Sequence, residues 1–172
     1  MTDLADVAQD APFLDDYLQF LLATSSGLAS HPFHQQVMAA GIAVAEWRVM
    51  ACLSDNDGQM VTELARLAQM EQSRLTRVIE RMERRGFVTR RRAGGDRRKV
   101  HVWLAPEGAA IAAGLIARAR AQEAAFLAEH LTPSEGQRLK ALLSKLIRSA
   151  SRDITAAIRR GWWRRMVAGA AQ

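Results

Sequence analysis

The sequence has few of the residues that metal sites and disulfide frameworks require. Its 172 residues include one cysteine, Cys52, so no internal disulfide can form. The four histidines are scattered at positions 31, 34, 101 and 130, which argues against a structural zinc site. Cys52 lies among apolar neighbours, where a thiol is a small buried hydrophobic group rather than a redox sensor. We expect no metal or other cofactor.

Long apolar runs and catalytic motifs are also missing. No uninterrupted apolar stretch approaches the roughly 20 residues of a membrane span, and the N-terminal region lacks the features of a secretory signal. The sequence has no paired carboxylates, no nucleophile with a base and no phosphate-cradling glycine loop. We therefore expect a cytoplasmic protein without a membrane span that is not an enzyme.

Positive charge is absent from one end of the chain and abundant at the other. Residues 1–46 contain no lysine or arginine and six acids, whereas residues 101–172 hold eleven lysines and arginines against five acids. Opposite charges favour contact between the two ends, within one chain or between two. The alternative is that residues 1–11 form a frayed acidic tail.

The most informative stretch runs from residue 61 to residue 104. Apolar residues predict two short packed helices, and the second has a stripe at i, i+3, i+4 and i+7, formed by Leu75, Val78, Ile79 and Met82. Its opposite, solvent-facing side is polar and cationic, with Ser73, Arg74, Arg77, Arg81 and Arg84. Gly86 is typical of a helix end.

After Gly86 the apolar period changes to two, which predicts a β-hairpin with an arginine-rich tip around residues 93–96. Residues 71–99 hold eleven cations and four acids, an excess of +7, against +6 for the whole chain. A run of charge alone is usually solvated surface. Because this one coincides with two packed helices and a hairpin, we interpret it as a winged helix-turn-helix that binds nucleic acid.

The flanking segments are predicted to be helical. We expect helices over 13–29 and 33–40 with a break at residues 30–32, a helix over 44–54, a long helix over 106–130, and a last helix that starts at Pro133. Their apolar stripes exceed what one subunit can cover, which favours a homodimer. The tail after residue 158 contains Trp162 and Trp163 between arginines, a composition that fits dimer packing or an anionic membrane surface.

These elements predict a mainly α fold with a small β-hairpin wing. We divide the chain into N-terminal dimerisation helices (1–41), a winged helix-turn-helix DNA-binding domain (42–105) and C-terminal dimerisation helices (106–172), all part of one intertwined unit.

Three motifs and a glycine resemble the MarR family of bacterial transcription regulators. The motifs are EWRVMACL at 46–53, TELARLAQMEQSRLTRVIERMERRGFVTRR at 62–91 and GDRRKVHVWL at 95–104, and the glycine is Gly108. The resemblance covers roughly residues 42–110. Two positions depart from the family pattern: Gln69 stands where glycine is common in the turn, and Ala105 replaces the usual capping threonine.

The resemblance implies how the chain would bind double-stranded DNA. The second helix, about residues 72–85, would enter the major groove and contact it through Ser73, Arg74, Thr76 and Arg77. Arg98 at the wing tip would enter the minor groove, with Asp96 orienting it. The full set of candidate DNA-binding residues is Thr62, Ser73, Arg74, Thr76, Arg77, Arg81, Asp96, Arg97 and Arg98. A two-fold dimer would read a palindromic operator.

The resemblance also implies a small-molecule effector, which makes the protein a ligand-responsive repressor. Candidate ligand residues are His31 and His34 at the predicted break, and Trp47 and Arg48, which supply a flat apolar wall and a cation for an aromatic carboxylate. An aromatic acyl-CoA is the second candidate effector. The alternative is that these four residues bind no ligand and only pack within the protein. Two other functions stay open: a non-specific architectural DNA-binding protein and a winged-helix interaction module.

Overall fold

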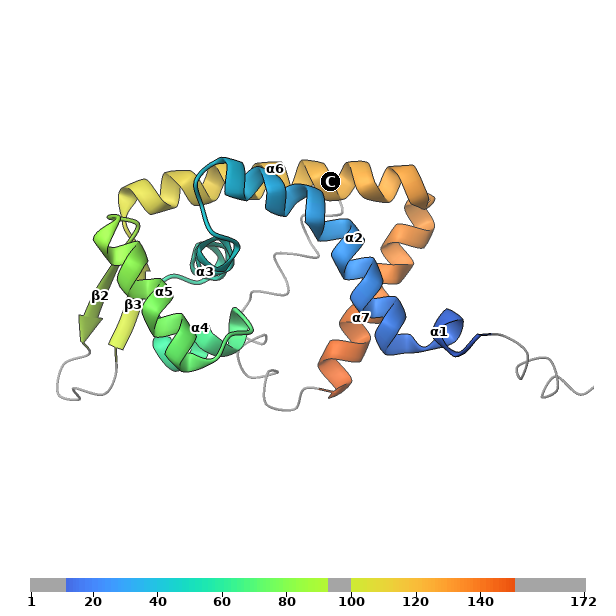
Figure 1. The fold of residues 1–172 in the computed structure, drawn as a ribbon, viewed down its shortest axis with the longest axis horizontal. Coiled ribbons are helices and arrows are strands. Elements are labelled where there is room, and N and C mark those ends of the chain that lie inside the picture. Colours follow the sequence, from blue (N-terminus) through green and yellow to red (C-terminus); the bar gives the residue numbers. More distant parts are fainter. Residues whose placement is uncertain (1–11, 93–99, 151–172) are drawn as a thin grey trace, which may run out of the picture.

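A computed structural model describes residues 12–92 and 100–150. Figure 1 shows one long helix, α6 (Pro106–His130), as a bar along the top of the molecule. The elements between residues 44 and 104 lie below one end of α6. Below the other end lie α7 (Pro133–Ala150) and the first part of α2 (Leu18–Ala39). The mainly α fold with a small β wing is confirmed.

The N-terminal helices differ from the sequence-based prediction. A four-residue helix, α1 (Phe13–Asp16), ends at Tyr17, which is extended, and α2 then runs without a break through Pro32. The predicted interruption at residues 30–32 is therefore wrong. Proline removes one backbone donor, a loss that the helix tolerates here because the following turn is anchored by the buried Phe33 and Val37.

The winged helix-turn-helix forms as predicted. Helix α3 (Val44–Asp55) leads through the short strand β1 (Gln59–Met60) to α4 (Val61–Leu67) and α5 (Gln72–Arg84). All four residues of the predicted stripe on α5 are buried, in one core with α3, α4, the wing and α6. Between α4 and α5, Gln69 adopts a left-handed backbone with φ 53°. A side chain in that conformation costs about 1–2 kcal/mol, which the buried helices on either side outweigh.

The wing is a three-stranded antiparallel sheet in the order β1-β3-β2. Strands β2 (Val88–Arg92) and β3 (Val100–Leu104) pair with Arg90 opposite Val102, and β1 adds an edge that the sequence did not indicate because it has two residues. Gly108 lets α6 start directly against the wing, since a Cβ there would lie 2.0 Å from the carbonyl oxygen of Phe87. This explains the motif glycine by packing.

The long C-terminal helices begin with different signals. Ala105 makes no side-chain cap for α6, which starts with proline in its first turn. Helix α7 has a capping box: Thr132 N–H donates to Glu135 Oε2 at 2.8 Å, and Glu135 N–H donates to Thr132 Oγ1 at 3.4 Å. The pKa of Glu135 lies below its usual value because its carboxylate accepts hydrogen bonds from the Thr132 hydroxyl, at 2.6 Å, and from the Thr132 N–H.

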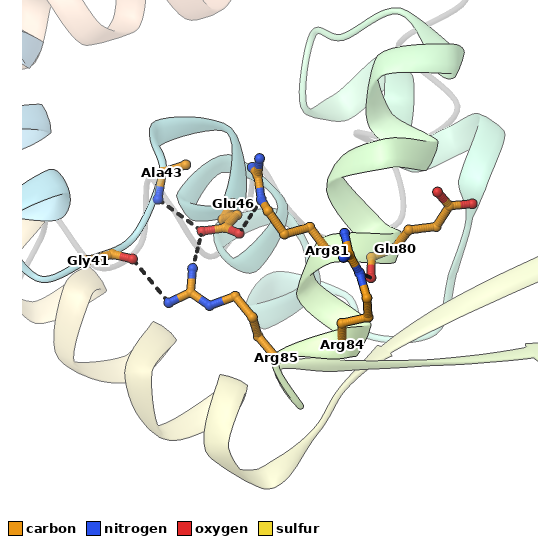
Figure 2. Close-up of polar contacts among 7 residues, drawn as sticks. All are labelled: Gly41, Ala43, Glu46, Glu80, Arg81, Arg84 and Arg85. Carbon is orange, nitrogen blue, oxygen red and sulfur yellow. Dashed lines mark hydrogen bonds and ion pairs between the residues drawn. The ribbon is translucent and has the colours of Figure 1, made fainter.

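One carboxylate, Glu46 on α3, is fully buried beneath α5 (Figure 2). Its Oε2 accepts the N–H of Ala43 at 2.9 Å and Arg85 Nη1 at 2.9 Å, while its Oε1 accepts Arg81 Nε at 2.8 Å. Arg85 also donates through Nη2 to the carbonyl of Gly41, just after α2, at 3.0 Å. By position in the chain Glu46 belongs with the acids of residues 1–46, whereas the structure places it inside the winged unit.

The balance of these contacts sets the charge state of Glu46. Burial alone would raise the pKa of the carboxyl, but the Ala43 N–H and the guanidinium groups of Arg81 and Arg85 outweigh it, so the pKa is lowered from its ordinary 4.5. A lowered pKa contributes stability that is complete above the unfolded-state value and is lost as the pH falls through the folded-state value.

We therefore predict that Glu46→Gln lowers the free energy of unfolding at neutral pH by about 1–3 kcal/mol, because a buried neutral amide replaces the charged acceptor of three hydrogen bonds. The difference from wild type should shrink as the pH falls below about 4.5, because wild type then also loses the charge. Denaturant unfolding at several pH values measures both effects. Glu80→Gln, a half-exposed carboxylate on α5, is the control and should change stability by less than about 0.5 kcal/mol. A constant difference across this pH range would contradict the assignment.

Candidate nucleic-acid interface

The outward face of α5 carries side chains that the fold leaves available. Ser73, Arg74 and Arg77 are exposed, and neither arginine forms an ion pair with any residue in the described ranges. Thr76 is half-buried, and its hydroxyl donates to the carbonyl of Gln72 one turn earlier at 2.9 Å. Thr76 Oγ1 can still accept a hydrogen bond, so a polar contact with a partner remains open to it.

Helix α5 lies between two grooves. The first, about 400 Å³, is bounded by α4, α5 and the wing, and the second, about 490 Å³, lies between α5 and the α2–α3 junction. The candidate residues Thr62 and Thr76 line the first groove, and Arg74, Arg77 and Arg81 line the second. A helix with a hollow on each side can enter a wider groove such as the major groove of DNA, which admits one α-helix.

Arg81 differs from the other cations on α5. Its side chain was predicted to face outward, and 46% of it is exposed, but its Nε donates to the buried Glu46. Arg85 is held more completely, by Glu46, by Gly41 and by the ring of Phe87, whose centroid lies 4.4 Å from its Cζ. These two arginines hold α5 in place, and Arg74 and Arg77 remain for a partner.

The wing is also attached to α5 by an arginine. Arg90 donates through Nε to Glu83 Oε2 at 2.8 Å, and its Nη2 lies 2.6 Å from the same oxygen. The hydrogen bond from Arg90 lowers the pKa of Glu83, and Glu83 in turn raises the pKa of Arg90. Arg91 instead lies over the ring of Trp103. The predicted wing-tip residues Asp96, Arg97 and Arg98 lie outside the described residues.

The four candidate ligand residues lie on α2 and α3. His31 and His34 are on one continuous helix rather than at a break, with His31 exposed and His34 half-buried. Trp47 is half-buried and packs edge-on against Phe33, with ring centroids 5.0 Å apart. Neither groove beside α5 includes any of the four in its lining.

Arg48 is exposed and close enough to His34 to affect its charge. The pKa of His34 is lowered, first by burial and then by the positive charges of Arg48 and His31. His34 is therefore neutral near pH 7, and Arg48 supplies the positive charge at this position. Arg48 and His31 are thus within electrostatic range of His34.

The remaining chemistry is sparse. Within the described ranges, no group of three or more histidines, cysteines and acids is placed to hold a metal ion. Burial raises the pKa of Cys52 to about 12, with a further contribution from Asp55, as expected for an unreactive thiol. Among the described helices, none is by itself long and apolar enough to span a membrane, although α2 and α3 together meet that criterion and are bent by 99°.

Comparisons with known proteins place this geometry among DNA-binding regulators. Residues 42–100 match the model of the MarR family. The chain is 30% identical over 98 residues to the homoprotocatechuate degradative operon repressor of Escherichia coli, a match that spans 57% of this chain and just under two thirds, 66%, of that repressor.

Solved structures extend the likeness over more of the chain. The MarR family transcriptional regulator SPO1453 from Silicibacter pomeroyi is 44% identical, with a TM-score of 0.72, over 81% of this chain and 99% of that one. The MarR family protein Rv2887 of Mycobacterium tuberculosis, solved in complex with salicylic acid, is 28% identical, with a TM-score of 0.62, over 81% and 98% of the two chains. Since nearly all of a 44% identical family member is matched in sequence and fold, this chain belongs to the MarR family of transcriptional regulators.

Proposed function

We propose that the protein is a cytoplasmic, homodimeric repressor that binds a palindromic operator and releases it when a small aromatic acid binds. The observation that carries the DNA-binding part is the outward face of α5, where Arg74 and Arg77 have no ion-pair partner among the described residues. Repression is supported by the Escherichia coli relative, which is an operon repressor. The proposed domain boundaries at 41/42 and 105/106 belong to the same hypothesis.

The proposed contacts divide between bases and phosphates. Arg74 and Arg77 are free to reach base edges, and a bidentate arginine on guanine is the commonest specific contact in the major groove. Arg81, with Nε committed to Glu46, has its two Nη groups left for a phosphate oxygen. Arg97, Arg98 and Asp96 are proposed for the minor groove from the family resemblance.

Homodimerisation is supported by apolar side chains that one chain leaves uncovered. Large hydrophobic residues of α1, α2 and α7 are between about one third and two thirds exposed; they are Phe13, Leu14, Tyr17, Leu18, Phe20, Leu21, Leu22, Leu28, Met38, Leu139, Leu142, Leu146 and Ile147. Most of them belong to α1, the first half of α2 and α7, which lie below one end of α6 in Figure 1, whereas Met38 lies at the end of α2 beside α5. Exposed apolar side chains in this number are typical of an interface, and a second copy would cover them.

The effector proposal rests on Arg48, His34 and Trp47. Trp47 and Phe33 form an apolar wall, and Arg48 supplies a charge that a carboxylate can pair with. The relative from Mycobacterium tuberculosis was solved with salicylic acid, which is an aromatic carboxylate. An aromatic acyl-CoA is the second candidate, for which exposed cations such as Arg118 and Arg120 on α6 would meet the phosphates.

For DNA, we predict that the wild-type protein enriches one palindromic sequence from a random pool and that Arg77→Ala weakens binding to it. The expected loss is about 1–3 kcal/mol, with relaxed preference at one base pair of each half-site. Selection followed by binding titrations measures both. Arg120→Ala, an exposed cation on α6, is the control and should leave the preference unchanged. Enrichment of no sequence would leave a non-specific architectural binder, and the absence of DNA binding would leave an interaction module.

For assembly, we predict that Leu142→Glu combined with Leu146→Glu converts a dimer into a monomer without unfolding it. Both leucines are already about half exposed in one chain, so the substitutions should cost the protomer little and the interface much. Light scattering measures the mass, and circular dichroism checks the fold. Lys145→Glu, on the same helix, introduces a carboxylate at an exposed polar position and should leave the dimer intact. A double variant that stays dimeric would remove α7 from the interface.

For the effector, we predict that a free aromatic carboxylate releases the selected DNA and that Arg48→Ala raises the concentration required by roughly tenfold or more, the loss expected for a charged hydrogen bond. A real effector must change the DNA dissociation constant as well as bind. Titrating salicylate-like acids and their CoA thioesters against labelled DNA separates the two candidate classes. Arg118→Ala is the control for the free acids. An unchanged response in Arg48→Ala would remove this site.

A further inference from the structure

The Glu46 cluster joins α3 to α5 and to the residue that follows α2. Arg81 lies in the last turn of α5, and Arg85 follows the helix directly. Glu46 comes from the first turn of α3, and the carbonyl of Gly41 follows the last turn of α2 (Figure 2). Arg85 spans the gap by itself, since Nη1 binds Glu46 and Nη2 binds Gly41. Helix α2 is also one that exposes apolar side chains for a second copy.

We propose that Glu46 is a positioning residue for DNA recognition. Through Arg81 and Arg85 it holds α5 in one orientation relative to the end of α2, and so relates the DNA-facing side of α5 to the proposed dimer surface. This inference rests on the proposed function. The orientation of α5 affects DNA binding because two copies of α5 must reach two half-sites at once.

Directional contacts explain why this cluster, rather than the apolar core, would set the orientation. The stripe of α5 is buried by hydrophobic contact, which has no preferred direction and tolerates small rotations or slides. A buried carboxylate tolerates much less, because any lost partner leaves a charge without compensation. The planar guanidinium of Arg85 adds a second restriction, since its two donors keep a fixed separation between Gly41 and Glu46.

The burial of Glu46 also argues against a direct role in DNA contact. Its side chain is fully buried, so a phosphate or base cannot reach it. Its negative charge, placed beneath the cationic face, weakens attraction to DNA in general. If Glu46 acted only through its charge, it would lower the affinity for DNA. If it positions α5, it raises the selectivity for one DNA sequence.

The sign of the effect therefore tests the proposal. Glu46→Gln removes one negative charge and keeps an oxygen for the Ala43 N–H. If only the charge of Glu46 matters, the variant should bind every DNA more tightly. If Glu46 positions α5, the ratio of the affinities for selected and random DNA should fall by about tenfold or more, comparable to the effect of one mismatched base pair. Both affinities are measured with the full-length protein and the sequence enriched by wild type. Glu80→Gln makes the same charge change on an exposed side chain and should not lower the ratio.

A second pair of variants changes no charge. Arg85→Lys keeps the cation but replaces the two separate donor nitrogens that bind Glu46 and Gly41 by one. Arg84→Lys changes the neighbouring arginine, whose Nε donates to Glu80 O at 3.4 Å within α5. We expect the ratio to fall in Arg85→Lys and to hold in Arg84→Lys. If Glu46→Gln proves unfolded by circular dichroism at the assay temperature, this pair decides the question. Equal ratios in Arg85→Lys and Arg84→Lys would overturn the proposal.

Hydrogen exchange without DNA separates failure of this inference from failure of the proposed function. Loss of the cluster should speed exchange both in α5 and at residues 40–43 in Arg85→Lys, relative to wild type and Arg84→Lys. Wild-type protein that enriches no DNA sequence would sink the proposed function, and the exchange result would still decide whether the cluster joins α5 to α2. Exchange that is unchanged at both places would refute the cluster's positioning role.

Discussion

The cationic face of α5 points outward because its opposite face is buried. Four side chains of this helix, Leu75, Val78, Ile79 and Met82, fill the centre of the core, where α3, α4, the wing and α6 meet. With about 100° between successive residues, burial of that stripe leaves Ser73, Arg74 and Arg77 directed to solvent. A groove lies on each side of this outward face. Burial of one apolar stripe therefore orients the candidate interface on α5.

The arginines of residues 71–99 make different contacts, although nothing in the sequence distinguishes them. Arg74 and Arg77 remain available for a partner, Arg81 and Arg85 bind a buried carboxylate, and Arg90 joins the wing to α5 through Glu83. The formal excess of +7 over residues 71–99 thus overstates the charge free to meet phosphates. Part of it is neutralised by Glu46, a residue that lies outside that segment in the chain.

Helix α2 connects the two ends of the molecule. Its first part carries apolar residues that one chain leaves exposed, and its last part is buried against α3 and α6 through Phe33 and Val37. His34 lies on the same last turns, near Arg48 of α3, so a ligand there would touch the helix that also reaches the Glu46 cluster. A ligand can change DNA affinity only if it binds two conformations unequally, and a junction of helices offers such conformations.

The sequence by itself determined the local structure of this protein: the apolar period of α5, the glycine after it, the hairpin and the capping box of α7. These depend on residues within a turn or a strand of one another, which a pattern can show. The tertiary structure decided what spans longer distances. Glu46 meets Arg81 and Arg85 across 35 and 39 residues, and α2 continues through Pro32 because packing of the turn after it outweighs one lost hydrogen bond. A local sequence pattern does not predict these contacts, because their energies arise only when segments distant in the chain are buried together.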